Sequence, residues 1–134
     1  MTKQRAPKVR TTSEHEYRLT IAPHFNAERQ ARTVLITIET TRRFASFRYE
    51  LAVQEELTEK ELRLTIVGLK APQLSLPASG TAQFIREYDN LKGTYSVTVA
   101  SLDGTENTFV IKFTAKNITL LKSPKQPIVE LVVS

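Results

Sequence analysis

The sequence predicts an all-β protein, an antiparallel β-sandwich of about eight strands. Three observations support this fold class. Apolar and polar residues alternate over several short runs, the pattern of strands that have one buried and one solvated face. The run at 33–40 is rich in β-branched residues, which favour strands. The glycines fall at expected turns or just ahead of expected strands, so the local signals agree with one another.

Length and composition favour a single domain. The chain has 134 residues, a formal net charge of +5 and no cysteine. The missing cysteine excludes disulfides, thiolate nucleophiles and cysteine-ligated metal sites. We expect a flexible basic tail at 1–13 and one β-sandwich domain at 14–134. The basic start of the chain has no apolar run behind it, and no window approaches the ~18 apolar residues of a membrane span, so we expect a cytoplasmic protein.

The charge is unevenly distributed along the chain. Residues 1–48 hold ten basic and four acidic residues, 49–106 hold five and nine, and 107–134 hold four and one. Such a split can orient an anionic partner. We favour the other interpretation, a basic tail joined to ordinary solvated faces, because net charge is weak evidence for a partner.

The first third of the domain predicts two strands. Alternation at 17–21 indicates a strand that ends at Pro23, because proline cannot donate to a sheet ladder. Residues 26–31 begin with a capping asparagine and predict one short helical turn. The run at 33–40 predicts a central strand. Its buried face should consist of Val34, Ile36 and Ile38.

The middle of the chain predicts two further strands separated by charged residues. After a turn at 40–43, alternation from Phe47 to Val53 indicates a strand. Residues 54–61 predict a charged loop or one helical turn, since Thr58 and Glu61 have capping-box spacing. Alternation resumes at Leu62, Leu64 and Ile66, and this strand should end at Gly68 and Pro72, before a short extended link at 74–77.

The last part of the chain predicts four strands. In the strand at 81–88 the register stays open, because Phe84 and Ile85 compete for the buried face. Strict alternation predicts a strand at 93–102, followed by an Asp103-Gly104 hairpin turn. The returning strand should bury Phe109, Ile111 and Phe113. A connector containing Pro124 and Pro127 then leads to a hydrophobic strand at 128–133.

Residues 91–99 carry a resemblance to a known superfold. Leu91 and Gly93 precede Tyr95, which begins an alternating strand. This arrangement resembles the tyrosine corner of immunoglobulin-like and fibronectin-type-III-like sandwiches, over residues of about 15–115. The resemblance implies that Tyr95 is the corner tyrosine, that its hydroxyl bonds nearby backbone, and that Val97 replaces the second bridging cysteine. The first cysteine and the core tryptophan have no counterpart here, which excludes an antibody-type domain.

No motif predicts catalysis, a metal or a cofactor. His15 and His24 lie nine residues apart at the two ends of one expected strand, so they do not form a ligand cluster. The acids at 50–61 are interpreted as a solvated face, and Asp89 and Asp103 adjoin turns. Phosphate-cradling glycine loops and nucleophile elbows are absent from the sequence. We therefore expect no enzyme and no cofactor, and an enzyme or metal-binding domain is the weakest alternative.

The expected function is that of a noncatalytic protein-interaction or accessory domain. It would bind a partner protein, or a second copy of itself, through a sheet face or an edge strand, and no membrane. The 128–133 strand is a candidate edge, although closing the core would explain it equally well. The alternative is nucleic-acid binding by phosphate contacts. Its candidate residues are Lys3, Arg5, Lys8 and Arg10 of the tail and Arg42, Arg43 and Arg48 near the expected turn.

Overall fold

The computed structural model describes residues 16–44, 49–70, 80–89, 91–125 and 127–133. These residues form nine strands, namely β1 (Tyr17–Asn26), β2 (Ala31–Phe44), β3 (Glu50–Leu57), β4 (Glu61–Lys70), β5 (Gly80–Tyr88), β6 (Gly93–Ala100), β7 (Glu106–Phe113), β8 (Ile118–Lys122) and β9 (Val129–Val133). The predicted all-β class is therefore confirmed. The tail at 1–13, Phe47 and the link at 74–77 lie outside the described residues.

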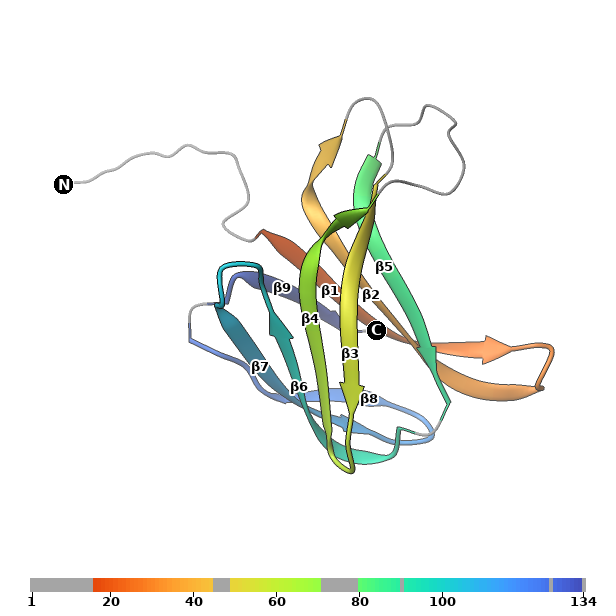
Figure 1. Ribbon diagram of the computed structural model, residues 1–134. Helices are drawn as coiled ribbons and strands as arrows, with labels where there is room; N and C mark the ends of the chain where they lie inside the picture. Colours follow the sequence, from red (N-terminus) through yellow and green to blue (C-terminus); the bar gives the residue numbers. More distant parts are fainter. Residues whose placement is uncertain (1–15, 45–48, 71–79, 90, 126, 134) are drawn as a thin grey trace.

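All nine strands belong to one sheet, in the order β8-β7-β6-β4-β3-β5-β2-β1-β9. The sheet curls into a nearly closed, barrel-like shape (Figure 1) rather than forming the antiparallel sandwich of about eight strands that the sequence predicted. The pairing is mixed, because β1–β9, β4–β6 and β3–β5 are parallel pairs. Large twisted sheets tend to curl on themselves, so one strongly bent sheet can enclose a core without a second layer.

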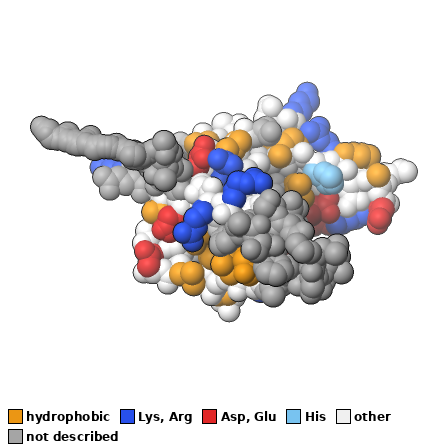
Figure 2. All heavy atoms as spheres, turned by 90° about the horizontal axis from the view of Figure 1, so that it is seen from above, with side chains coloured by type: hydrophobic (Ala, Val, Ile, Leu, Met, Phe, Trp, Pro, Cys, Tyr) orange, Lys and Arg blue, Asp and Glu red, His pale blue; other side chains and the backbone are white. Residues whose placement is uncertain are grey.

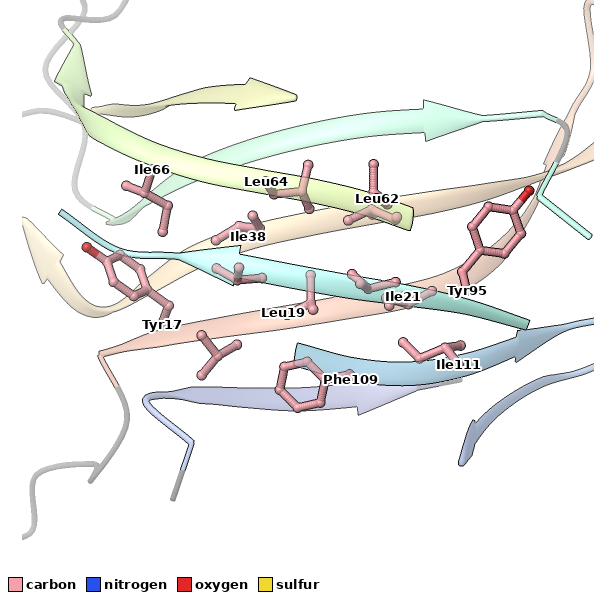
Figure 3. Packing of buried hydrophobic residues seen from close by; sticks show 14 of the residues in the cluster. Tyr17, Leu19, Ile21, Ile38, Leu62, Leu64, Ile66, Tyr95, Phe109 and Ile111 are labelled. Atoms are coloured by element: carbon pink, nitrogen blue, oxygen red, sulfur yellow. The ribbon is translucent and has the colours of Figure 1, made fainter. Parts of the chain in front are cut away.

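The core fills the inside of this curled sheet (Figure 3). Tyr17 and Tyr95 lie near its two ends, and between them are aliphatic side chains from β1, β2, β4, β6 and β7. The largest fully buried side chains are Phe109, Phe113, Leu19, Ile21, Ile36, Ile38, Leu62, Leu64, Ile66, Ile111, Val97 and Val99. Most of these residues were predicted from alternation alone, because the period of two assigns every second side chain to the inside.

The structure settles the register of β5. Ala82 is fully buried and Phe84 packs against the core, whereas Ile85 is 55% exposed. The ladder places Phe84 opposite Ile38 and Ile85 opposite Thr37, so the buried face of β5 continues the buried face of β2.

The first hairpin is longer than the sequence predicted. β1 does not end at Pro23 but continues to Asn26, with Pro23 opposite Val34. Pro23 lies beyond Ile21, the last residue that pairs with β9, and proline is tolerated where a strand is an edge. The expected helical turn is instead a hairpin turn, in which the Asn26 side-chain oxygen accepts a hydrogen bond from the Arg29 amide at 3.1 Å.

Two segments that the sequence predicts as a turn and a loop belong to strands. Residues 40–43 remain within β2, with a register shift against β5 between Glu39 and Arg43. Residues 54–57, which include Glu55 and Glu56, also remain strand. The β3–β4 connection is short, with the Thr58 amide bonded to the Glu61 carbonyl at 2.9 Å. β4 continues past Gly68, whose φ of 152° accompanies a bulge near Ala52. These segments were missed because their outward side chains are charged and exposed, which mimics a loop.

The hairpin of β6 and β7 matches its prediction. Tyr95, Val97 and Val99 are buried on β6, and Phe109, Ile111 and Phe113 are buried on β7. The Tyr95 and Phe113 rings pack edge to face, with their centroids 5.7 Å apart. Lys60 Nζ lies 5.0 Å from the centroid of the Tyr95 ring. The Tyr95 hydroxyl has no hydrogen bond to any described residue, so the ring is buried as expected without the backbone bond that a tyrosine corner implies.

Asp103 organises the turn of this hairpin. Its Oδ1 accepts hydrogen bonds from the Ser101 hydroxyl at 2.5 Å and from the Thr105 amide at 2.9 Å. These bonds, with that of Ser101 first, lower the Asp103 pKa from 3.8 to about 2. Gly104 follows at φ 90°, a conformation that favours glycine.

We predict that Asp103→Asn destabilises the domain most where the carboxylate is ionised. The folded pKa is lowered, so the stabilisation is fully present above pH 3.8 and is lost as the pH falls towards about 2. Thermal unfolding of the variant and of the wild type should therefore differ most near about pH 6 and converge near about pH 2. Glu28→Gln, in the exposed turn of the first hairpin, is the matched control. A stability difference that does not depend on pH would contradict this role for Asp103.

Candidate functional site

The sheet has two edges, β8 and β9, and they differ in how they are covered. β9 runs parallel to β1, from Val129 opposite Tyr17 to Val133 opposite Ile21. Val129 is fully buried, whereas Val132 is 40% exposed. The last strand thus both closes the core and forms an edge, so the two interpretations left open by the sequence each hold for part of it.

One buried side chain attaches β9 to the far side of the sheet. Asn107 on β7 is 3% exposed, and its Oδ1 accepts hydrogen bonds from the amides of Ile128 at 2.7 Å and Val129 at 3.1 Å. Its Nδ2 donates to the Glu106 carbonyl at 3.0 Å. The side-chain oxygen of Asn107 therefore accepts hydrogen bonds from two backbone amides that face no partner strand among the described residues.

A compact turn at 114–117 leads into β8, in a region where the sequence predicts only a connector. The Thr114 hydroxyl oxygen accepts a hydrogen bond from the Asn117 amide at 2.9 Å, and the Thr114 amide donates to the Asn117 carbonyl at 2.9 Å. This turn reverses the chain, so that Ile118 stands opposite Phe113 and Leu120 opposite Ile111. A threonine–asparagine turn between two apolar runs was the available signal for this hairpin.

The core side of β8 is only partly covered. Leu120 stands directly opposite Ile111, which is fully buried, yet Leu120 is 41% exposed. Leu121, at the register shift near Val110, is 53% exposed. Only Ile118 of this strand packs against the core. The sheet therefore presents an edge strand with an exposed apolar surface, the kind of edge to which a further strand can be added.

Four lysines surround this apolar edge. Lys112 stands opposite Thr119, Lys122 opposite Val110, and Lys116 and Lys125 lie in the segments on either side of β8. Each side chain is exposed, and none forms a salt bridge with a described residue. The surroundings of β8 therefore carry positive charge that no described acidic residue pairs with.

The predicted phosphate contacts are not brought to this edge. Arg42 and Arg43 are exposed at the end of β2, where Thr40 hydrogen bonds to the Arg42 carbonyl at 2.7 Å and Arg43 stands opposite Thr81. Lys3, Arg5, Lys8, Arg10 and Arg48 lie outside the described residues. Figure 2 shows this end of the molecule, with basic side chains among acidic and hydrophobic ones. Arg18 bonds Glu130 and Lys70 bonds Glu50, so some bases of the protein already have partners.

The most connected carboxylate, Glu87, has a structural role. It accepts hydrogen bonds from the Thr33 hydroxyl at 2.6 Å and the Asn26 amide group at 3.1 Å, and it lies 3.9 Å from His24. The bonds from Thr33 and Asn26 lower the pKa of Glu87, so it is a poor proton acceptor. His15 lies outside the described residues, and no metal-binding group of histidine and acidic side chains occurs within them.

A second polar cluster bridges a weak place in the sheet. Among the described residues, β3 and β5 pair through Glu50 and Gln83 alone. Further along the same two strands, Glu55 on β3 accepts a hydrogen bond from the Tyr88 hydroxyl at 2.5 Å and lies 2.7 Å from the Arg86 guanidinium. Burial and then this bond raise the pKa of Tyr88, so the phenol stays neutral. The cluster replaces missing ladder bonds between these strands.

Comparison with protein-family models, with curated proteins and with solved structures found no match to this chain. Within the described residues there is no helix of the length and apolarity needed to cross a membrane.

We predict that Glu55→Ala weakens the junction of β3 and β5. The variant loses two hydrogen-bonded contacts to one partly exposed carboxylate, so the free energy of unfolding should fall by about 1–2 kcal/mol in denaturant titrations. The pKa of Tyr88, followed by ultraviolet absorbance, should fall towards its ordinary value. In the wild type the stabilisation is present below pH 10 and is lost as the pH rises above it. Glu59→Ala in the β3–β4 turn is the control, and an equal loss there would refute the bridge.

Proposed function

We propose that this protein is a noncatalytic interaction domain that binds an extended segment of a partner protein as an added strand along β8. The proposal rests on the exposure of the Leu120 side chain. It lies on the core side of the sheet, opposite a fully buried residue, and is nevertheless 41% exposed. An added strand would bond the free backbone edge of β8 and would cover this side chain.

The energetics favour such an addition. Main-chain hydrogen bonds supply affinity, and pockets for alternate side chains supply specificity. Covering the remaining exposed surface of Leu120 contributes on the order of 1 kcal/mol, since full burial of a leucine is worth ~1.5–3 kcal/mol. β8 has five residues, so the added strand needs to be only about as long.

Charge selects the kind of partner. The four lysines around β8 (Lys112, Lys116, Lys122 and Lys125) lack salt bridges to described residues. Pairing of β8 with β8 of a second copy would bring these lysines together, and like charges across an interface oppose binding. A partner segment that alternates apolar and acidic residues meets both the leucines and the lysines. We therefore favour such a segment over self-association.

A second candidate function and the cellular location are also predicted from the sequence. Nucleic-acid binding through Arg42 and Arg43 is the alternative function, supported by their exposure at the end of β2. Cytoplasmic location is likewise an expectation from the sequence.

We predict that a synthetic heptapeptide of alternating valine and glutamate binds this edge. In nuclear magnetic resonance titrations, changes in amide chemical shift should be concentrated in β8. The titration is done at ~50 mM salt, because attraction between the glutamates and the lysines is screened least at low ionic strength. The matched valine–lysine peptide should bind much more weakly. Leu120→Asp should abolish binding of the acidic peptide, while circular dichroism shows that the domain remains folded.

Leu57→Asp is the control for this experiment. Leu57 is 48% exposed, comparable to Leu120, but it lies on β3. Equal loss of binding in both variants, or shifts spread over the whole surface, would contradict recognition at β8. A concentration-dependent dimer that Leu120→Asp abolishes would show that the edge instead binds a second copy.

A further inference from the structure

A second feature of the surface is a hollow of about 180 Å³. Three connections form its walls: the β1–β2 hairpin, the link between β5 and β6, and the β7–β8 turn. Its apolar lining includes Val34, Leu91 and Ile118, of which Leu91 is buried. The hollow is separate from the exposed leucines of β8, because Leu120 and Leu121 do not line it.

Cations from all three connections meet at this hollow. Arg32 comes from the hairpin, Lys92 from the link and Lys116 from the turn. Each side chain is exposed and none has a salt bridge to a described residue. The acidic residue of the lining, Asp89, is already paired with Arg29. The hollow therefore combines an apolar lining with positive charge that the protein itself does not neutralise.

The backbone that carries these cations is held in place. Lys60 Nζ donates a hydrogen bond to the Lys92 carbonyl at 2.8 Å. The Lys116 amide donates to the Thr114 hydroxyl oxygen at 3.3 Å. Arg32 lies within the β1–β2 ladder, opposite Phe25. Fixed attachment points reduce the ordering that a bound anion would require, which favours binding.

The size and charge of the hollow define a class of ligand. Its volume is below the ~300–1,000 Å³ that is usual for drug-sized ligands, so the ligand must be small. Three cations match a phosphate monoester, which carries about −1.5 to −2 charges near neutral pH, better than a single carboxylate. The apolar lining of Val34, Leu91 and Ile118 offers a surface to an apolar or aromatic body attached to the phosphate.

We propose that the hollow binds the phosphate group of a small phosphomonoester whose organic part is apolar or aromatic. Arg32, Lys92 and Lys116 bind the phosphate oxygens, and Val34, Leu91 and Ile118 contact the organic part. The hollow does not include the leucines of β8, but Lys116 belongs both to the hollow and to the lysines around β8, whereas Arg32 and Lys92 belong to the hollow alone.

Phenyl phosphate is the probe that tests this site. Titrated into the full chain at ~50 mM salt, it should shift the amides of 31–34, 91–92 and 114–118. Lys92→Ala and Lys116→Ala should each weaken binding about tenfold, because each removes a charge-assisted hydrogen bond. Inorganic phosphate should bind more weakly than phenyl phosphate, and phenol should not bind.

Arg43→Ala is the control, because it removes an exposed cation at the other end of β2. It should leave the affinity for phenyl phosphate unchanged, as should Leu120→Asp, which disrupts only the β8 edge. All of these side chains are exposed, so each variant should fold, and circular dichroism is the measurement that checks this. The proposal is overturned if phenyl phosphate produces no shifts around the hollow, or if Arg43→Ala weakens binding as much as Lys92→Ala does.

Discussion

The closure of this sheet depends on the two hydrogen bonds that Asn107 accepts from the amides of Ile128 and Val129. A barrel closed by a complete ladder has no edges, whereas here the strand order ends at β8 and β9. A buried side chain provides the connection that a ladder would otherwise provide. Because Asn107 is 3% exposed, water cannot readily replace it, and its loss would leave buried donors unsatisfied.

The same constraint explains why the two edges differ. β9 is bonded to β1 along its length and is connected to β7 by Asn107, so its first residue belongs to the core. Within the part of the chain that the structure describes, β8 forms ladder bonds with β7 alone, and no side chain corresponding to Asn107 covers Leu120. Side chains also support the junction of β3 and β5, where the described residues form a single backbone pair. There Glu55 contacts Arg86 and Tyr88 across the junction. Side chains thus connect β9 to β7 and support the junction of β3 and β5. At β8 no such connection is seen among the described residues, and we interpret this strand as the binding edge.

Much of the fold could be predicted from local pattern, and the failures have physical causes. Alternation identified the buried faces of β6 and β7, because both strands have one face in the core. It missed β8, where Leu120 and Leu121 are both exposed and the period of two is disrupted by a register shift. The charged end of β3 was taken for a loop, because its outward side chains contact solvent and Arg86 rather than a core. The single curled sheet could not be predicted either, since parallel pairings such as β4 with β6 join segments with no local signal.

The candidate sites are harder to predict from the sequence than the strands. Asn107 occupies an ordinary polar position in an alternating run, and only the arrival of β9 gives it a role. The predicted arginines of β2 are exposed, but Arg32, Lys92 and Lys116 are far apart in the sequence and are brought together by three different connections. No spacing rule identifies such a cluster, because its geometry follows from the curling of the sheet.

Hydrogen–deuterium exchange of individual amides tests the central claim most directly. If Asn107 replaces a ladder, the amides of Ile128 and Val129 are protected in the wild type and lose protection in Asn107→Ala. The amides on the outer edge of β8 exchange rapidly in both proteins. Strong protection along that outer edge, or unchanged protection of Ile128 and Val129 in the variant, would show that backbone pairing closes the sheet and would contradict this account.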